Sequence, residues 1–246
     1  MEISNSTVII TGGSSGIGLE LCKQLLRKNN KVICCSRSLE KLTAAKKQLH
    51  DLIIYQCDIA QESECRDFAK WIVANYPETN VLINNAAIAT KVDFIEDAFA
   101  LDNLNEEIGT NLVASIRLIK LFYPLLIKNK NPKIINITTG LVYVPLAIYS
   151  FYNATKSALH SFTQVLRHQL QKENITIIEV MFPVVETPWH NGNVPKMAIK
   201  PEKAVLEMLK GIRRNQLEIR VSKVKLLYFL FRIFPQFAFK KINNGS

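Results

Sequence analysis

Tyr152 and Lys156, four residues apart, form the pair most able to move a proton. Residues i and i+4 of a helix share one face, so both side chains would point into the same cleft. A free tyrosine has a pKa of about 10, and a nearby ammonium lowers it. The pair predicts general acid–base chemistry, although a tyrosine packed over a lysine stem has the same spacing. Tyr143 and Tyr149 compete by proximity, but neither has a lysine four residues on.

A glycine-rich segment near the N-terminus could hold a phosphate. It follows the β-branched run at residues 8–10 and has the sequence TGGSSGIG at residues 11–18. Glycines let the backbone turn tightly and approach a pyrophosphate, and the next helix offers N–H groups and the positive end of its dipole. Any sharp turn between a strand and a helix favours glycine. The position between the first expected strand and helix favours a dinucleotide site.

The hydrophobic pattern predicts the scaffold that would bring these segments together. Short continuous apolar runs predict strands at 8–10, 32–35, 52–55, 81–83, 133–137, 175–180 and 217–221. Helical spacing predicts helices at 17–28, 39–49, 61–75, 104–129 with a break, 150–171 and from Pro201 onward. This alternation is typical of an α/β fold. We predict a single Rossmann-type domain with a doubly wound, mostly parallel sheet and helices on both faces.

Length and composition agree with one such domain. The 246 residues are 48% hydrophobic and 21% charged, which suits a folded core. The first residues lack the charged and apolar regions of a signal peptide, and the apolar run at 226–231 is far shorter than the roughly 18 residues of a membrane span. We therefore expect a cytoplasmic protein. The five cysteines have no zinc-ligand spacing, so no metal site is expected.

Three motifs in the same order and spacing resemble the short-chain dehydrogenase/reductase (SDR) family: residues 11–18, the NNAA sequence at 84–87, and the Tyr152–Lys156 pair opening a helix. The resemblance covers about residues 5–220, and the run at 135–145 is similar to the bacterial DltE-like oxidoreductase branch. It implies hydride transfer between a nicotinamide cofactor and a carbonyl or secondary alcohol. In such an enzyme Tyr152 donates the proton, and Lys156 lowers the pKa of the tyrosine and holds the ribose.

The resemblance assigns two further catalytic positions. The family usually has a serine after the fifth strand to hold the substrate oxygen, and Thr139 stands there in this sequence. Threonine keeps the hydroxyl but adds a methyl group, so we expect activity with a tighter pocket. Asn111 matches an asparagine that relays protons through water to the lysine. Alternatively Asn111 bonds a kinked helix, and both roles can hold together.

The resemblance also implies a cofactor site. Asp58, followed by Ile59, matches the contact to the adenine amino group, and Asn85 and Ala86 would pass under the adenosine ribose. After the sixth strand, residues 182–187 depart from the family's PGxVxT pattern at Phe182 and Pro183. The remaining residues expected at the phosphates, ribose or nicotinamide are Gly12, Ser14, Ser15, Gly16, Ile17, Gly18, Tyr152, Lys156, Val185 and Thr187.

The end of the second strand decides between the two nicotinamide cofactors. An acidic residue there would bond the ribose 2′-hydroxyl and repel a 2′-phosphate. This sequence has Ser36 and then Arg37. A guanidinium can bind a phosphate through two hydrogen bonds, or only stack on adenine. We predict that NADP(H) is favoured over NAD(H).

The positive charge of the chain is concentrated near its C-terminus. The formal net charge is +10, and residues 210–241 hold nine basic residues and one acid. We therefore divide the chain into a catalytic domain, 1–221, and a basic, aromatic-rich extension, 222–246. The extension could make peripheral membrane contact, cover the substrate cleft or pack on a second subunit. Six consecutive apolar residues at 226–231 fit burial against protein somewhat better, and no nucleic-acid-binding module is present.

Together these features predict an NADP(H)-dependent carbonyl reductase of a small molecule, with an apolar or lipid-like substrate, in the homo-oligomer that is the family's habit. One alternative is a 3-oxoacyl thioester reductase, whose acidic carrier protein could use the basic extension. Another is a dinucleotide sensor without turnover, favoured only by the departures at Thr139 and at residues 182–183. The segment 188–200, with Trp189 and His190, is expected to line or cover the pocket.

Overall fold

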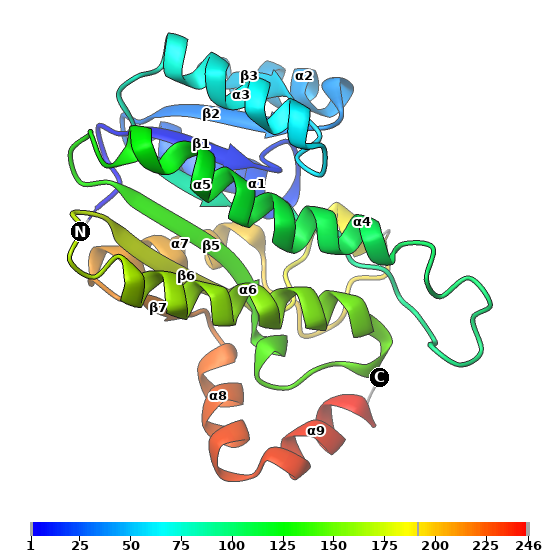
Figure 1. Ribbon diagram of the computed structural model, residues 1–246. Helices are drawn as coiled ribbons and strands as arrows, with labels where there is room; N and C mark the ends of the chain where they lie inside the picture. The colour runs from blue at the N-terminus through cyan, green and yellow to red at the C-terminus, as the bar shows by residue number, and fades with distance from the viewer. Residues whose placement is uncertain (1, 191, 245–246) are drawn as a thin grey trace.

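A seven-stranded sheet in the order β3-β2-β1-β4-β5-β6-β7 forms the centre of the protein (Figure 1). The computed structural model describes residues 2–190 and 192–244. Every strand pair is parallel, so the predicted, mostly parallel Rossmann-type sheet is confirmed and is wholly parallel. The strands are β1 Thr7–Thr11, β2 Lys31–Ser36, β3 Ile53–Gln56, β4 Thr79–Asn84, β5 Lys133–Thr139, β6 Thr176–Phe182 and β7 Glu218–Arg220.

Helices cover both faces of this sheet (Figure 1). One face packs against α1 (Gly16–Leu26), α2 (Leu39–Gln48) and α7 (Pro201–Arg213). The other packs against α3 (Glu62–Asn75), α5 (Ala114–Leu126) and α6 (Ser150–Gln169). The strand order reverses between β1 and β4, and ligands of such sheets bind beyond the carboxyl ends of the strands at that point. The glycine loop, residues 12–15, lies directly after β1.

The break expected within residues 104–129 is a π-helical turn. Helix α4 (Leu104–Ile108) continues into this turn (Gly109–Val113) and then into α5. Wider turns of this kind often occur at functional sites. Here the turn carries Asn111, whose side chain is fully buried.

The C-terminal segment forms two helices, α8 (Val224–Ile233) and α9 (Pro235–Asn243). Leu227, Tyr228 and Phe231 pack with Tyr143 and with Val144, Met181, Val224 and Ala238 in a small separate cluster. Leu226 and Phe229 are instead 70% and 61% exposed, so only part of the apolar run is buried against the domain. A helix turns consecutive residues to different sides, which is why burial divides the run. Across residues 2–190 and 192–244, no helix is long and apolar enough to cross a membrane.

The first prediction concerns Gly18, where α1 approaches the glycine loop. A Cβ atom on Gly18 would lie 2.2 Å from the backbone oxygen of Gly12, which cannot move away cheaply. Gly109 is also helical, but a Cβ there meets only Ala60, at 3.7 Å. We expect Gly18→Ala to lower the free energy of unfolding by roughly 1–3 kcal/mol. Gly109→Ala serves as the control and should change it by less than about 1 kcal/mol. Equal urea midpoints for Gly18→Ala and the wild type would contradict this packing.

Candidate active site

Thr11, the last residue of β1, fixes the glycine loop to the segment that follows β4. The backbone N–H groups of Asn85 and Ala86 both donate to Thr11 Oγ1, each at 3.0 Å. The Asn85 side-chain amide donates to the carbonyls of Thr11 and Gly12, at 3.0 and 3.3 Å. Gly12 has a φ of +68°, and a Cβ there would lie 2.9 Å from Ala86 Cα. Asn85 and Ala86 therefore lie against the loop as expected, but the Asn85 amide is engaged in holding the loop.

The beginning of α1 fits a pyrophosphate. Gly16 starts the helix with a φ of +52°, the Ser15 side chain makes no capping hydrogen bond, and the first turn, with Ile17 and Gly18, has no acid. The first N–H groups of a helix lack partners within it and carry partial positive charge, which favours a bound phosphate. Thr187 Cγ2 would lie 3.1 Å from a Cβ on Gly16, so the segment after β6 passes beside this loop.

Polar side chains gather at the adenosine end of the expected site. Ser14 Oγ donates to Ser36 Oγ at 3.0 Å. Arg37 Nη1 donates to Glu106 Oε1 of α4 at 2.6 Å, and both side chains are exposed. The guanidinium expected at a 2′-phosphate thus already has a carboxylate partner, which the sequence did not reveal.

Asp58 and Ile59, after β3, take local roles in this structure. Asp58 Oδ1 accepts a hydrogen bond from the Ala60 N–H at 3.0 Å, which fixes the turn into α3. Ile59 is 6% exposed, and its carbonyl accepts from Arg117 at 3.4 Å. Asp58 itself is half-buried and keeps part of its surface open.

Thr139, Tyr152 and Lys156 come together where β5 ends and α6 begins. The Thr139 side chain lies close enough to the Tyr152 hydroxyl to act on its pKa. Lys156 Nζ lies 5.9 Å from the centre of the Tyr152 ring and donates to the Ile137 carbonyl at 2.9 Å. The spacing of tyrosine and lysine therefore does place both on the face of α6 that meets the end of β5.

The pKa values in this arrangement differ from the expectation. Burial raises the pKa of Tyr152 to about 12, and the Thr139 side chain acts against this rise. Burial lowers the pKa of Lys156 to about 8, opposed by the charge of Glu179. The expected lowering of the tyrosine pKa by the lysine is not found here. The lysine is 2% exposed, bonds a β5 carbonyl and is itself destabilised as a cation.

Asn111 connects three elements around this group. Its side chain donates to Ile88 O at 2.8 Å and to Thr155 Oγ1 at 3.1 Å, and it accepts from Ile88 N at 2.9 Å. The structure therefore shows the side chain of a widened helix bonding the segment after β4 and α6. This is the structural role that the sequence left open beside the proton relay.

Glu179, in β6, is a fully buried carboxylate near the site. It was not predicted from the sequence. Thr138 Oγ1 donates to it at 2.5 Å, and His160 Nδ1 lies 2.8 Å from its Oε2. His160 follows Lys156 by four residues and shares its face of α6. The sequence signal that could have revealed this buried carboxylate is a single acid inside an otherwise apolar strand, TIIEVMF.

Glu107 of α4 is a second missed carboxylate. It is fully buried, and its Oε1 accepts from the Thr90 N–H at 2.6 Å. Its Oε2 finds no hydrogen-bond partner in the part of the chain that the structure describes, and burial raises its pKa. Together with Asn111, four residues on, it holds segment 88–90 from one side.

The two competing tyrosines lie in different surroundings. Tyr143 is 8% exposed, and its hydroxyl accepts from Arg220 at 2.9 Å and donates to Met181 Sδ at 3.0 Å, beneath α8. Tyr149 is close to the site, because its ring centre lies 6.4 Å from that of Tyr152 and 5.5 Å from that of Trp189. The segment that carries Trp189 therefore lies close to Tyr152, on the side of β6.

Val185 and His190 fix that segment. Val185 is 5% exposed and bridges to Ile199 in parallel fashion. His190 Nε2 lies 3.0 Å from the carbonyl of Val185. The replacement of the family's proline and glycine by Phe182 and Pro183 leaves β6 continuous to Phe182, which is buried.

These features define a nucleotide-dependent oxidoreductase of the Rossmann class. The family model for short chain dehydrogenases matches residues 6–198, and the chain belongs to this family. The oxidoreductase DltE of Bacillus subtilis, described as uncharacterized, is 39% identical over 249 residues, which cover 99% of each chain. The chain is therefore an oxidoreductase of the DltE-like branch, as its motifs predict.

Two solved short-chain dehydrogenases have the same fold. One from Burkholderia cenocepacia, in complex with NADP, gives a TM-score of 0.85 at 22% identity and covers 98% of this chain and 99% of its own. One from Burkholderia phymatum, in complex with NAD, gives 0.82 at 15% identity and covers 95% and 96%. Since these two structures hold different cofactors, the shared fold does not decide between them.

The second prediction concerns the pair of His160, which is partly exposed, and Glu179, which is buried. The hydrogen bond that His160 donates to the Glu179 carboxylate raises the pKa of His160. The stabilisation is therefore complete below the ordinary histidine pKa of about 6.5 and is lost as the pH rises through the raised value. We expect His160→Gln to cost about 1–3 kcal/mol at pH 6 and less at pH 9, measured by urea unfolding. His168→Gln, on the exposed side of the same helix, is the control. A cost that does not change with pH would contradict the charged pair.

Proposed function

We propose that the protein is an NADP(H)-dependent carbonyl reductase. The observation that carries this proposal is the meeting of Thr139, Tyr152 and Lys156 at the end of β5. Bound NADPH would supply the hydride that adds to the carbonyl carbon. The hydroxyls of Thr139 and Tyr152 would hold the carbonyl oxygen, and the glycine loop and Thr187 would hold the phosphates.

The protein's own groups would supply the proton. A tyrosine with a pKa of about 12 stays protonated at neutral pH, so Tyr152 can donate its proton to the oxygen as negative charge develops there. Lys156, with a pKa of about 8, can take up and release a proton near neutral pH and bind the ribose. Asn111 would join the lysine to solvent through water. These assignments favour reduction over oxidation, which would require the tyrosinate.

The preference for NADP(H) is proposed from Ser14, Ser36 and Arg37, with Asp58 near the adenine. No acid stands at the end of β2 to repel a 2′-phosphate. The contact between Arg37 and Glu106 is exposed on both sides, so it is weak enough for a phosphate to replace. Glu106 then acts as a competitor that reduces the affinity for NADPH.

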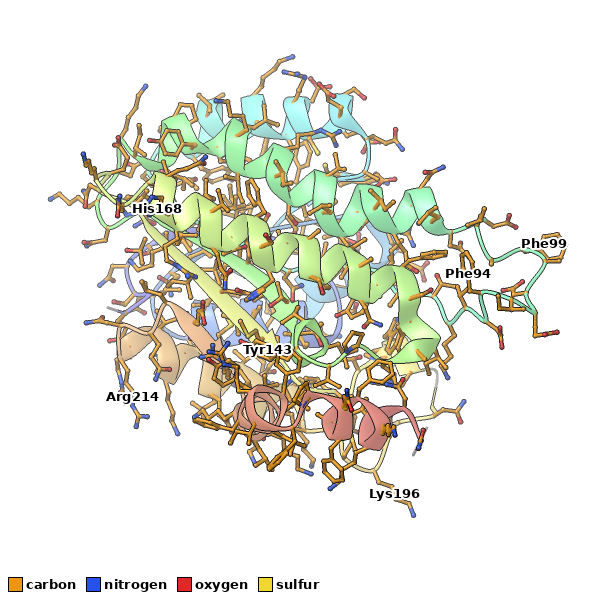
Figure 2. All side chains as sticks on the ribbon, turned by 60° about the horizontal axis from the view of Figure 1, so that its bottom comes forward. Phe94, Phe99, Tyr143, His168, Lys196 and Arg214 are labelled. Atoms are coloured by element: carbon orange, nitrogen blue, oxygen red, sulfur yellow. The ribbon has the colours of Figure 1, made fainter. Side chains whose placement is uncertain are left out.

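An apolar carbonyl substrate is favoured by the side chains that border the site. The ring centre of Phe94 lies 6.5 Å from that of Phe151, the neighbour of Tyr152. Phe94 is 61% exposed, on a segment that projects beside α4 and α6 (Figure 2). Further exposed apolar residues of this segment and of segment 188–200 are Ile95, Phe99, Leu101, Trp189, Val194 and Met197. A 3-oxoacyl thioester is one substrate of this kind. We also propose that the protein is a cytoplasmic homo-oligomer. A dinucleotide sensor without turnover is less favoured, because it would not need Thr139, Tyr152 and Lys156 to lie together.

The third prediction separates catalysis from binding. Tyr152→Phe removes the proton donor but leaves the glycine loop intact, so turnover of carbonyl substrates should fall by about 10²–10⁴ while NADPH binding is unchanged. Tyr149→Phe, the neighbouring tyrosine, is the matched control and should keep most of the activity. Stopped-flow absorbance and calorimetry measure the two properties. A Tyr152→Phe protein with full turnover would overturn the assignment.

The fourth prediction concerns cofactor choice. In calorimetric titrations the wild type should bind NADPH more tightly than NADH. Arg37→Ala should weaken NADPH binding by about 10–100-fold, the range of a charged hydrogen bond, and leave NADH unchanged. Glu106→Gln should strengthen NADPH binding by freeing the guanidinium. Arg66→Ala, which removes a comparable exposed ion pair on α3, is the control. Equal losses for both cofactors in Arg37→Ala would show that the arginine only stacks.

A further inference from the structure

Helices α8 and α9 have an apolar face that no other part of the described chain covers. Their inner residues pack on the domain around Tyr143 and Met181. Their outer residues are large, apolar and between 47% and 70% exposed: Leu226, Phe229, Ile233, Phe234, Phe237 and Phe239. Scattered exposed apolar residues are ordinary, but six within fourteen positions form a patch that monomers rarely leave in water. We call these six residues the outer face.

Basic side chains accompany the outer face and no acids do. Lys225, Arg232, Lys240 and Lys241 are exposed on the same two helices, and Lys223, directly before α8, is exposed as well. After Glu218 the sequence contains no acidic residue. A second copy of the chain docked face to face would bring two such clusters of positive charge together, which is unfavourable. The partner that fits both properties is apolar inside and negatively charged at its surface.

The two helices are fixed to the domain and do not form a loose tail. Asn243, the last residue of α9, donates to the Pro145 carbonyl at 3.1 Å and accepts from the Ala147 N–H at 2.6 Å. The Arg220 guanidinium lies 4.0 Å from the centre of the Tyr228 ring of α8. Figure 1 shows α8 below β7 and α9 turning back beneath the segment that precedes α6. The outer face is thus presented in a defined orientation, next to segment 145–147, which leads to Tyr152.

We propose that the outer face docks the protein on an anionic lipid bilayer. The phenylalanines, Leu226 and Ile233 enter the boundary between headgroups and acyl chains, and the lysines and Arg232 contact negatively charged headgroups. The helices lie in this boundary and do not cross the membrane. Docking in this way places segment 145–147, which leads to Tyr152, near the lipid surface. The inference does not depend on the proposed catalytic activity, because it concerns a surface outside the cofactor site.

The test is sedimentation of the full-length protein with lipid vesicles. The wild type should sediment with vesicles that contain phosphatidylglycerol, bind vesicles of phosphatidylcholine alone at least 10-fold more weakly, and be partly released by 0.5 M salt, which screens exposed charges. Phe229→Ser/Phe237→Ser should weaken binding to the anionic vesicles at least 10-fold. Lys240→Gln/Lys241→Gln should weaken binding to the anionic vesicles and have little effect on binding to the neutral vesicles.

The matched control is Val73→Ser/Val165→Ser, which removes two apolar side chains that are 51% and 53% exposed on α3 and α6. This variant should bind vesicles as the wild type does, and thermal unfolding should show that all variants are folded. Wild-type protein that stays in the supernatant with anionic vesicles overturns the proposal, and so does an equal loss of binding by the control. The proposal also fails if Phe229→Ser/Phe237→Ser turns a dimer into a monomer without affecting vesicle binding, since the outer face would then join two copies.

Discussion

The attachment of α6 to β5 and β6 is the constraint on which the site depends. Lys156 bonds the Ile137 carbonyl at 2.9 Å, Asn136 bonds Thr163 at 2.9 Å, and His160 lies 2.8 Å from Glu179. A buried polar or charged group that loses its partner costs far more than an exposed one. The helix therefore cannot slide or rotate on the sheet without breaking several of these contacts together. The position of Tyr152 relative to Thr139 follows from them.

A continuous line of polar contacts joins this attachment to the glycine loop. The backbone after β4 bonds Thr11 through Asn85, and the neighbouring Asn84 donates to Asn136 of β5 at 2.8 Å. Asn136 in turn bonds Thr163 of α6. The glycine loop and α6 are thus held in one register across β1, β4 and β5. Substitutions along this line would change the distance between the two parts of the site without touching either ligand.

The sheet and its covering helices could be predicted from the sequence, because continuous apolar runs and helical spacing are patterns of residues that are close together in the chain. The shared face of Tyr152 and Lys156 on α6, and the glycine loop after β1, could also be predicted, because they too depend on spacing between nearby residues. The partner of Arg37 could not be predicted, since Glu106 lies 69 residues away. The pKa of Tyr152 is raised by burial, which depends on the residues that surround the hydroxyl after folding. The nearby lysine alone therefore could not predict this pKa. The two C-terminal helices were missed because apolar residues occupy both their inner and outer sides.

Isotope transfer from the cofactor to a substrate would show whether the protein carries out hydride transfer. The protein would be incubated with NADPH deuterated at C4 of the nicotinamide, in either configuration, and with a panel of long-chain ketones and 3-oxoacyl thioesters. Mass spectrometry then shows whether the alcohol product carries deuterium. We expect one deuterium on the carbinol carbon from one of the two configurations when Tyr152, Lys156 and Thr139 are present. If NADPH binds and no carbonyl in the panel receives deuterium from either configuration, the protein is a nucleotide-binding module and not a reductase of such substrates.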